Sequence, residues 1–576
     1  MQRIGCWTAI VLTTIGLNAC AAPASPQDPG TGQDQQPGPT AATPARTLTL
    51  AYRVEPNTVV PKLATPGGTR DVKRLFNASL AFIDTQGTVR PYLAESLPQL
   101  NTDSWRVYPD GRMETTYRLR AGLAWHDGAP LTVDDFVFAR RVYATSGLGF
   151  IAVPQDQMEE VAALDPLTVL IRWSSIYTGA GYLRDTEFEP LPQHLLEAPL
   201  AAIEASGGAR EAFMNNPYWS AGYVGAGPYR LDHWAQGSEI AGSAFDKHAL
   251  GRPKIDRIIV RFLGDENAIA SNMLAEEVQF VGSFSLGFEY AGVFKRAWAE
   301  NKRGVVLLHD TAVAYSEFQF RPEYQRTPAL LDVRVRRALA HAVDRVALRE
   351  GLFSGEGDLV ETLLSREMPY YPEVERAIAR YPHDPQRSEQ LMNEAGYAKD
   401  RDGFFATAGG ERLTPSYRGL TGAIAEREQL LVTDSWRRAG FDIQPTSINV
   451  AQVQDLEYRS SHPGISSSQG NVTEASHSRF ASSEVSTPAR GWRGQNRGGW
   501  SNAEYDGLWN SFNSSLERDE RNRIMIAMAK LLSEELPAIF LYADIRVQAH
   551  LASLRGPERG TPDTLANWNI HEWEWR

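Results

Sequence analysis

The sequence predicts a soluble, mixed α/β protein of two or three structural units. The chain has 576 residues, 42% of them hydrophobic and 22% charged, so it is long enough and apolar enough to form a large core. Segments with the two-residue period of strands alternate irregularly with segments of helical period. The two cysteines, Cys6 and Cys20, lie near the N-terminus, so the folded body has no internal disulfide and no thiolate metal site.

Four segments show the pattern of β-strands. Residues 47–54 alternate polar and apolar side chains, and Glu55-Pro56 ends the run. Residues 114–119 and 168–173 have the same period. Residues 255–262 are apolar at nearly every position of their second half, which indicates a more buried strand.

Two longer segments show the helical period. Apolar residues stand at positions 335, 338, 339, 342, 343 and 346, with Asp332 as the N-cap and Gly351 as the C-terminal stop. We therefore expect one helix from Asp332 to about residue 350. A second helix is expected over residues 518–535, closed by Pro537 and followed by a short apolar strand at 538–542.

The N-terminus has the build of a bacterial secretory signal. Residues 1–3 supply a positive charge, and residues 4–17 are apolar but too short to span a bilayer as a helix. The junction Leu17-Asn18-Ala19-Cys20 resembles the lipobox of bacterial lipoproteins, which implies a signal peptide over 1–19 and lipid attachment to Cys20. An ordinary signal peptide with an incidental cysteine is the alternative. The lipobox interpretation predicts an extracytoplasmic protein, anchored to the membrane in the periplasm or at the outer cell surface.

A linker is expected over residues 20–46. Six prolines and three glycines, with no aromatic residue, follow Cys20, and a chain of this length spans on the order of 30 Å. No other stretch approaches 18 uninterrupted apolar residues, so we expect the N-terminal lipid to be the contact with the membrane.

Common catalytic motifs are absent from the sequence. It contains no Gly-x-Ser-x-Gly elbow, no His-Glu-x-x-His and no Walker A loop, and its eleven histidines are not spaced for a helical metal site. We therefore expect no enzyme, no catalytic residue, no metal and no cofactor. The net charge of −12 and the lack of a long basic run argue against nucleic acid as a partner.

Four longer stretches carry a family pattern. They are LAESL at 93–97 with TYRLRAGLAWHDGAPLTVDDF at 116–136, VGAGPYRL at 224–231 with GRPKID at 251–256, DVRVRRAL at 332–339 with AVDR at 342–345, and WSNAEYD at 500–506 with LPAIFLY at 536–542. In this order they resemble the family 5 extracellular solute-binding proteins of ABC importers, the oligopeptide- and dipeptide-binding group.

Physical interpretation assigns these stretches to the scaffold. Asp127-Gly128 forms a tight turn with Trp125 packed beneath it, and Thr132 is a suitable helix N-cap. His126 is expected to be structural rather than a ligand. Gly225 and Gly227 suit a crossing that needs unusual backbone dihedral angles.

The resemblance implies a two-lobed periplasmic-binding-protein fold with a hinge and an extra α/β subdomain inserted in the first lobe. We expect lobe one at 46–75, 216–305 and 531–576, the inserted subdomain at 76–215, and lobe two at 306–530. In such proteins the ligand contacts both lobes and favours the closed form, which the permease distinguishes from the open form.

The resemblance also indicates where the ligand lies. Relatives carry an aspartate for the peptide's α-ammonium group in a stretch that here, over 466–487, contains only Glu474 and Glu484 as acids. The glycine-rich segment 491–500 resembles the family's cleft-lining segment, although an exposed loop or a core position for Trp500 is an alternative. The predicted ligand-binding residues are Trp500, Gln319, Phe318, Tyr315, Trp492, Arg493, Asn496 and Arg497.

The expected function is capture of a peptide or related small solute and its delivery to ABC permease subunits by a monomeric protein. A ligand-sensing receptor of the same fold, a binder of a non-peptide such as an oligosaccharide or nickel complex, and an extracytoplasmic hydrolase are the alternatives.

Overall fold

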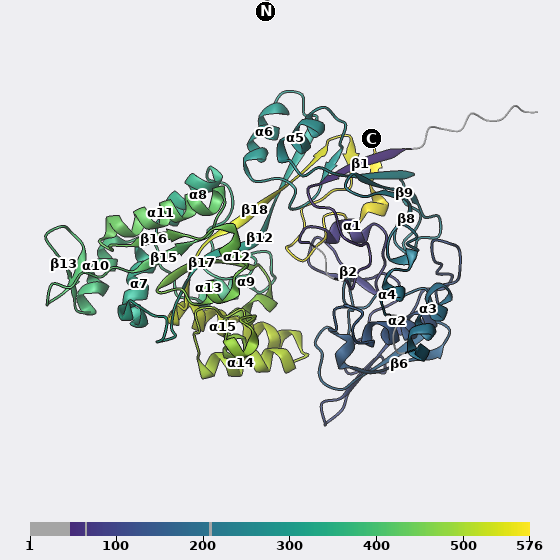
Figure 1. Ribbon diagram of the computed structural model, residues 1–576, viewed down its shortest axis with the longest axis horizontal. Coiled ribbons are helices and arrows are strands. Elements are labelled where there is room, and N and C mark those ends of the chain that lie inside the picture. Colours follow the sequence, from purple (N-terminus) through teal and green to yellow (C-terminus); the bar gives the residue numbers. More distant parts are fainter. Residues whose placement is uncertain (1–45, 64–65, 207–209) are drawn as a thin grey trace, which may run out of the picture. The chain divides into compact units, whose positions relative to one another are not determined.

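A ten-stranded sheet runs through the described part of the chain, residues 46–63, 66–206 and 210–576 of a computed structural model (Figure 1). The predicted signal peptide 1–19, Cys20 and nearly all of the predicted linker lie outside these residues. In spatial order the strands are β16 (Gln444–Ser447), β15 (Ser416–Gly419), β17 (Ile465–Asn471), β12 (Gly304–Phe318), β18 (Ala538–Leu551), β11 (Phe280–Val281), β1 (Thr47–Tyr52), β10 (Arg257–Phe262), β9 (Glu239–Ala244) and β8 (Tyr229–Ala235).

Two long antiparallel strands form the centre of this sheet. β12 and β18 pair from Gly304 opposite Leu551 to Glu317 opposite Ala538. The last part of β12 also pairs with β17, whereas the last part of β18 pairs with β11. The sheet therefore continues from residues of predicted lobe one to residues of predicted lobe two. The lobe boundaries themselves stay a prediction.

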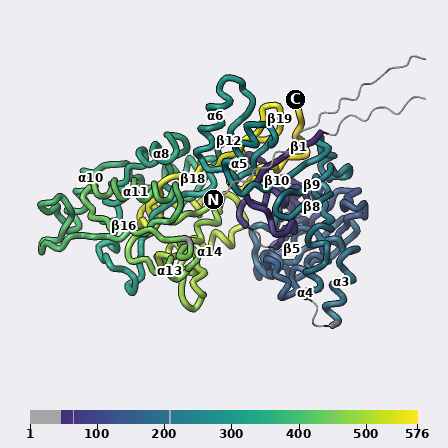
Figure 2. Tube along the Cα trace, turned by 45° about the horizontal axis from the view of Figure 1, so that its top comes forward, coloured from purple at the N-terminus to yellow at the C-terminus, as the bar shows by residue number. Residues whose placement is uncertain are grey.

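The N-terminal strand lies inside the sheet rather than at its edge. β1 pairs in parallel with β10 on one side and β11 on the other, and Figure 2 shows this purple strand beside the teal strands β10 and β9. Leu48, Leu50 and Tyr52 are buried, as the alternation of residues 47–54 predicts. Strands are confirmed near all four predicted positions, and β18 extends nine residues beyond the predicted end at 542.

A second, four-stranded antiparallel sheet lies within residues 105–173. Its order is β4 (Trp105–Val107), β5 (Met113–Arg118), β7 (Thr168–Trp173) and β6 (Met158–Asp165). Helices α2 (Val133–Ala144), α3 (Gln193–Ser206) and α4 (Arg210–Met214) lie nearby in the chain, and α2 contacts β6 and β7. The short pairs are β2 (Ala81–Ile83) with β3 (Val89–Pro91), β13 (Tyr397–Lys399) with β14 (Phe405–Thr407), and β19 (Leu554–Arg555) with β20 (Glu574–Trp575).

Most of the other helices follow β12 in sequence. They are α7 (Val333–Ala342), α8 (Arg345–Phe353), α9 (Tyr371–Ala377), α10 (Pro385–Glu394), α11 (Ala423–Ala439), α12 (Val450–Gln454), α13 (Leu456–Ser460), α14 (Ala503–Ser514) and α15 (Arg518–Glu535). The remaining three are α1 (Arg70–Arg74), α5 (Glu266–Leu274) and α6 (Glu289–Ala297). The predicted helix 518–535 is confirmed with the bounds of α15.

The prediction of one helix from residue 332 to 350 is wrong. α7 begins after Asp332, whose side chain accepts from the N–H of Arg334, but it ends before Val343, which has extended dihedral angles. Asp344 then caps α8 by accepting from the N–H of Ala347. The apolar period continues across this break, so it does not reveal the second cap. α8 ends at Phe353 rather than at Gly351.

Two of the family-like stretches pack against each other. The His126 ring is 5% exposed, its Nε2 lies 3.0 Å from the carbonyl oxygen of Gly227, and its Nδ1 accepts from the N–H of Gly225. Burial lowers the pKa of His126 to about 4. This geometry supports the structural role predicted for His126.

The two glycines at this contact allow a close approach of backbones. Neither Gly225 nor Gly227 has a positive φ, so the expectation of unusual dihedral angles is wrong. A Cβ at Gly227 would instead lie 2.3 Å from the backbone nitrogen of Asn77, and one at Gly225 would lie 2.0 Å from the carbonyl oxygen of Phe76. Only glycine fits at this spacing.

Candidate functional site

A cavity of about 590 Å³ is lined by widely separated parts of the chain. Its lining residues fall within 83–89 and 177–187 of the predicted inserted subdomain, within 365–369, 472–475 and 509–521 of predicted lobe two, and within 561–563. The volume falls in the range of small-molecule sites. Because these stretches are far apart in sequence, the fold alone brings them together.

Aromatic side chains supply apolar surface to this cavity. Trp509 and Phe512, one turn apart on α14, stack with ring centroids 5.8 Å apart and an interplanar angle of 16°. Tyr177 and Tyr182 also line the cavity, and Tyr177 stacks on Trp173 of β7 at 5.0 Å. Rings of this kind offer broad, sequence-tolerant contact surface to a ligand.

The carboxylate of Glu474 is already paired within the cavity wall. Arg518 Nη2 lies 2.9 Å from Glu474 Oε1, and the Tyr370 hydroxyl donates to the same oxygen at 2.7 Å. Arg521 Nη2 lies 3.8 Å from Glu474 Oε2, and its guanidinium also covers the Phe512 ring. Glu474 is therefore largely neutralised and offers little to a ligand ammonium group.

A second charged group comes from the predicted inserted subdomain. Arg184 lies 3.7 Å from Glu187 and 3.9 Å from Asp563, all three at the cavity wall. Burial raises the pKa of Glu187 to about 7, although Arg184 opposes this shift. The cavity thus combines aromatic rings with cations and acids that have partners in its wall.

None of the eight sequence-predicted ligand residues lines this cavity. Trp500 is 5% exposed and meets the Tyr505 ring edge to face at 5.2 Å. Phe318 and Tyr315 are buried among apolar side chains. Gln319 is fully buried, and its Nε2 donates to the carbonyl oxygens of Ser460 and His462 at 3.0 and 2.9 Å. Their contact with a ligand stays a prediction.

The predicted residues of the glycine-rich segment have different surroundings. Asn496 is buried and holds the segment together, since its Nδ2 donates to the carbonyl oxygens of Ala481 and Trp500. Trp492 has a left-handed φ of 61° and is partly buried, and Arg493 is exposed. Arg497 is partly buried, and its Nε has no hydrogen-bond partner among the described residues.

Some cavity residues were visible in the sequence and others were not. Glu474 stood out as one of two acids in the stretch where relatives carry an aspartate. Arg518 and Arg521 lie in the first turn of a predicted helix, and no local pattern connects them with Tyr177 or Tyr182. The sequence does not show which distant segments lie side by side, and this is what places these residues around one cavity.

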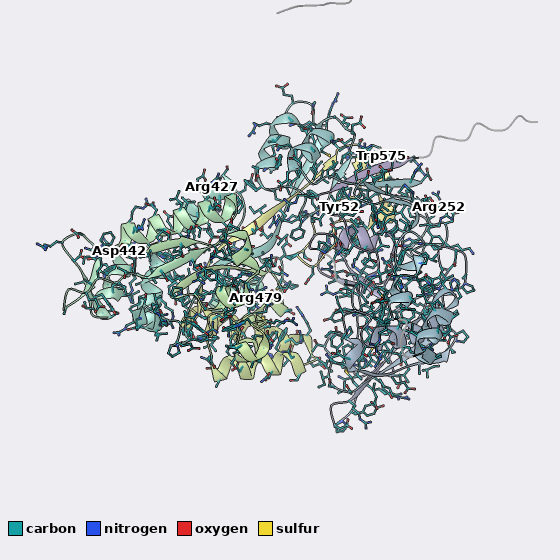
Figure 3. All side chains as sticks on the ribbon, in the orientation of Figure 1. Tyr52, Arg252, Arg427, Asp442, Arg479 and Trp575 are labelled. Carbon is teal, nitrogen blue, oxygen red and sulfur yellow. The ribbon has the colours of Figure 1, made fainter. Side chains whose placement is uncertain are left out.

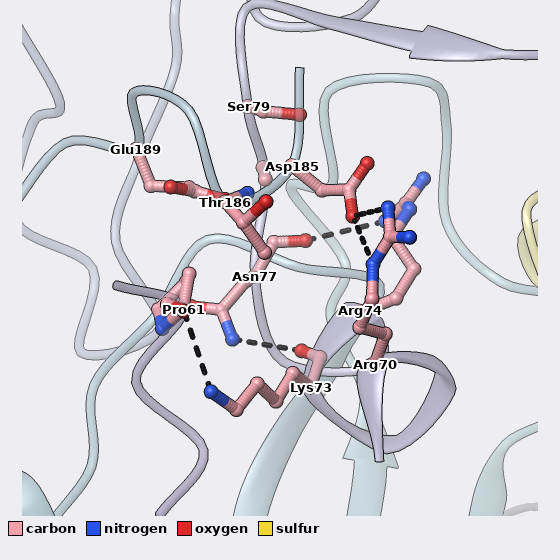
Figure 4. Close-up of a pocket in the computed structure, with 10 residues that line it drawn as sticks. Pro61, Arg70, Lys73, Arg74, Asn77, Ser79, Asp185, Thr186 and Glu189 are labelled. Carbon is pink, nitrogen blue, oxygen red and sulfur yellow. Dashed lines mark hydrogen bonds and ion pairs between the residues drawn. The ribbon is translucent and has the colours of Figure 1, made fainter. Parts of the chain in front are cut away.

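A small polar cavity beside α1 has a different character (Figure 4). Its volume is about 20 Å³, close to the space for a single water. Lys73 Nζ donates to the carbonyl oxygens of Val60 and Leu63 at 2.8 Å each, and burial lowers the pKa of Lys73 to about 8. Arg70 pairs with Asp185 at 2.6 Å, as Figure 4 shows. The size of this cavity excludes a peptide-sized solute.

The described residues contain no cluster of three or more histidine, cysteine, aspartate or glutamate side chains arranged to hold a metal ion. In the same part of the chain, no helix is long and apolar enough to cross a membrane.

Comparison with known proteins identifies the family. Residues 88–485 match the bacterial extracellular solute-binding proteins, family 5, so the chain belongs to this family, whose members bind substrates and are not enzymes. The oligopeptide-binding protein AppA of Bacillus subtilis is 21% identical over 580 residues, covering 98% of this chain and 97% of AppA.

Solved structures share the fold. The NikZ structure from Campylobacter jejuni in complex with Ni(L-His) has a TM-score of 0.69 at 20% identity and covers 92% of this chain and 100% of its own. The structure of AppA from Bacillus subtilis in complex with a nonapeptide has a TM-score of 0.64 at 19% identity, covering 93% and 100%. The predicted two-lobed α/β fold of family 5 solute-binding proteins is thereby confirmed.

Proposed function

We propose that this protein is the lipid-anchored, extracytoplasmic solute-binding component of an ABC importer. It captures a peptide or related small solute in the 590 Å³ cavity and delivers it to membrane permease subunits. The observation that carries this proposal is the cavity itself, which is lined by residues of predicted lobe two, of the predicted inserted subdomain and of the C-terminal stretch. A solute held by such separate elements favours one arrangement of them over others, which is what a permease can recognise.

A peptide is the first candidate solute. AppA of Bacillus subtilis is named as an oligopeptide-binding protein and has been solved with a nonapeptide. The aromatic rings at the cavity accept varied side chains. However, Glu474 is engaged by Arg518 and Tyr370, so an α-ammonium group would have to compete for it. A peptide whose α-ammonium group makes no contact with Glu474 is therefore the solute that fits this wall, and nickel chelates such as that held by NikZ are a second candidate.

The anchor part of the proposal rests on the sequence. The lipobox-like junction at Cys20 and the proline-rich stretch after it support a lipid-tethered body held away from the membrane surface. An apolar N-terminal segment and a single cysteine after the expected cleavage point are the supporting features.

Mass spectrometry of small molecules retained by the purified protein tests the proposal. The identified molecule is then titrated calorimetrically into Trp509→Ala, which removes a cavity ring, and into Trp492→Ala, which removes a ring of the glycine-rich segment. We expect Trp509→Ala to weaken binding about tenfold, the effect of losing roughly 1.4 kcal/mol of contact. If Trp492→Ala weakens solute binding and Trp509→Ala does not, the solute binds at the glycine-rich segment rather than in the cavity. Failure of the protein to retain or bind any solute would contradict the proposed function.

A further inference from the structure

A group of arginines surrounds one recessed carboxylate away from the cavity. Glu317 lies near the end of β12, where it pairs with Ser466 of β17, and it is 6% exposed. The arginines are Arg459 of α13, Arg479 of the 3-10 turn Glu474–Phe480, Arg497 of the glycine-rich segment and Arg321, just after β12. The charges of all four act on Glu317. None of these five residues lines the 590 Å³ cavity.

Backbone contacts hold the arginines near one another. Arg321 Nη2 donates to the carbonyl oxygens of Arg497, at 2.6 Å, and of Ser460, the neighbour of Arg459. Arg479 lies against β17, since a Cβ at Gly470 would be 3.3 Å from its Nε. Gly470 pairs with Val313 of β12, four residues before Glu317 on the same face of that strand. Arg321 therefore serves as a brace, while the other three guanidinium groups remain available.

These three guanidinium groups lack the partners that arginines normally have inside proteins. Over residues 46–63, 66–206 and 210–576, no hydrogen bond or ion pair joins the side chain of Arg459, Arg479 or Arg497 to another residue. The Nε of Arg497 is in addition buried. The carboxylate of Glu317 likewise has no hydrogen-bonded partner in this part of the chain, although arginines surround it. Like charges gathered without counter-ions repel one another, and the cost grows with burial.

We propose that Arg459, Arg479 and Arg497 form a binding site, separate from the 590 Å³ cavity, for a doubly charged oxygen anion, a phosphate or a dicarboxylate. Guanidinium groups bind such groups through paired, charge-assisted hydrogen bonds. Together with Arg321, four guanidiniums against one carboxylate leave a local charge of +3, which attracts a dianion. Glu317 acts against the anion and limits its affinity. The site is separate from the cavity proposed for the solute, so the inference does not rest on the proposed function.

Calorimetric titration with inorganic phosphate and with succinate, in chloride buffer of matched ionic strength, tests the site on the intact mature protein. We expect saturable binding of at least one of the two anions, weakened about tenfold by Arg459→Gln, Arg479→Gln or Arg497→Gln. Arg427→Gln is the matched control, because Arg427 is an exposed arginine of α11; Figure 3 labels it together with Arg479. The preferred anion tells phosphate from dicarboxylate chemistry.

The variant Glu317→Gln gives a result of opposite sign. Removing the negative charge should strengthen anion binding severalfold, a gain that loss of folding cannot produce. Absence of saturable binding in both the natural protein and Glu317→Gln would overturn the anion site, as would equal affinities in the arginine variants and the Arg427→Gln control. These outcomes are independent of the retained-solute experiment, so either proposal can fail while the other stands.

Discussion

Replacement of Trp500 tests whether this residue belongs to the hydrophobic core or to the ligand-binding site. Its side chain is 5% exposed, belongs to an apolar cluster with Tyr505 and Phe512, and contacts the Tyr505 ring at 5.2 Å. Replacing a buried tryptophan by alanine costs about 3 to 5 kcal/mol of unfolding free energy. We therefore expect Trp500→Ala to lower the unfolding free energy by this amount. A residue that only touches ligand would leave the free energy nearly unchanged.

Urea unfolding measures this difference when it is monitored by far-ultraviolet circular dichroism, a backbone signal that does not depend on the replaced tryptophan. Trp509→Ala is the control, since Trp509 is partly buried and makes one ring contact in the cavity wall, with Phe512 at 5.8 Å. Its stacking is worth roughly 0.5 to 1.5 kcal/mol. A Trp500→Ala variant as stable as the natural protein, with weakened solute binding, would refute the core assignment and restore the ligand role predicted for Trp500.

Three further predictions follow from particular contacts. Burial raises the pKa of Asp71 from its ordinary 3.8 to about 6, so the folded state keeps this proton to higher pH than the unfolded state. The unfolding free energy should then fall as pH rises from about 4 to 6. Asp71→Asn should stabilise the protein at pH 7 by up to about 3 kcal/mol, which is the pKa difference of 2.2 multiplied by 1.36 kcal/mol, and should change little at pH 4. Urea titrations at both pH values measure the two effects. Gly227→Ala would place a Cβ 2.3 Å from the backbone nitrogen of Asn77 and should abolish soluble folded protein, whereas Gly264→Ala, with open space around it, should be tolerated; equal yields would contradict the close-approach argument. Cys20→Ser should release the protein from membrane fractions and from metabolic lipid labelling without changing its unfolding curve, and a labelled variant would exclude Cys20 as the anchor.

Local sequence patterns predicted the elements whose ends are set by local chemistry. The helix at residues 518–535 was predicted with its observed bounds because Pro537 stops it and the apolar stripe is continuous. The break at Val343 was missed because the apolar period runs through it, and Asp344 was not recognised as a second N-cap. β18 was cut short at residue 542 because the shorter apolar run was taken as the whole strand, whereas alternation continues to Leu551.

The site was less accessible to sequence reasoning. The cavity joins Tyr177, Glu474 and Asp563, which no spacing rule connects. Composition alone also could not show which of Trp500 and Trp509 reaches the cavity. Trp500 is the last residue of the glycine-rich segment and is buried, whereas Trp509 lies on a helix and reaches the cavity. Exposure depends on how the helix packs, which is a tertiary property.

Glu317 and Glu474 differ in how arginines balance their charge. Glu474 is paired directly with Arg518 and lies 3.8 Å from Arg521, so one carboxylate faces two guanidiniums. Glu317 has four arginines around it and no direct bond to them, so a larger excess of positive charge remains there. The whole chain carries a net charge of −12, which repels anions at long range. An anion at the proposed arginine site would therefore gain its selectivity at short range, where the guanidinium groups of Arg459, Arg479 and Arg497 replace the water around its oxygens. Binding of this anion should weaken as ionic strength rises, because salt screens the partly exposed guanidiniums.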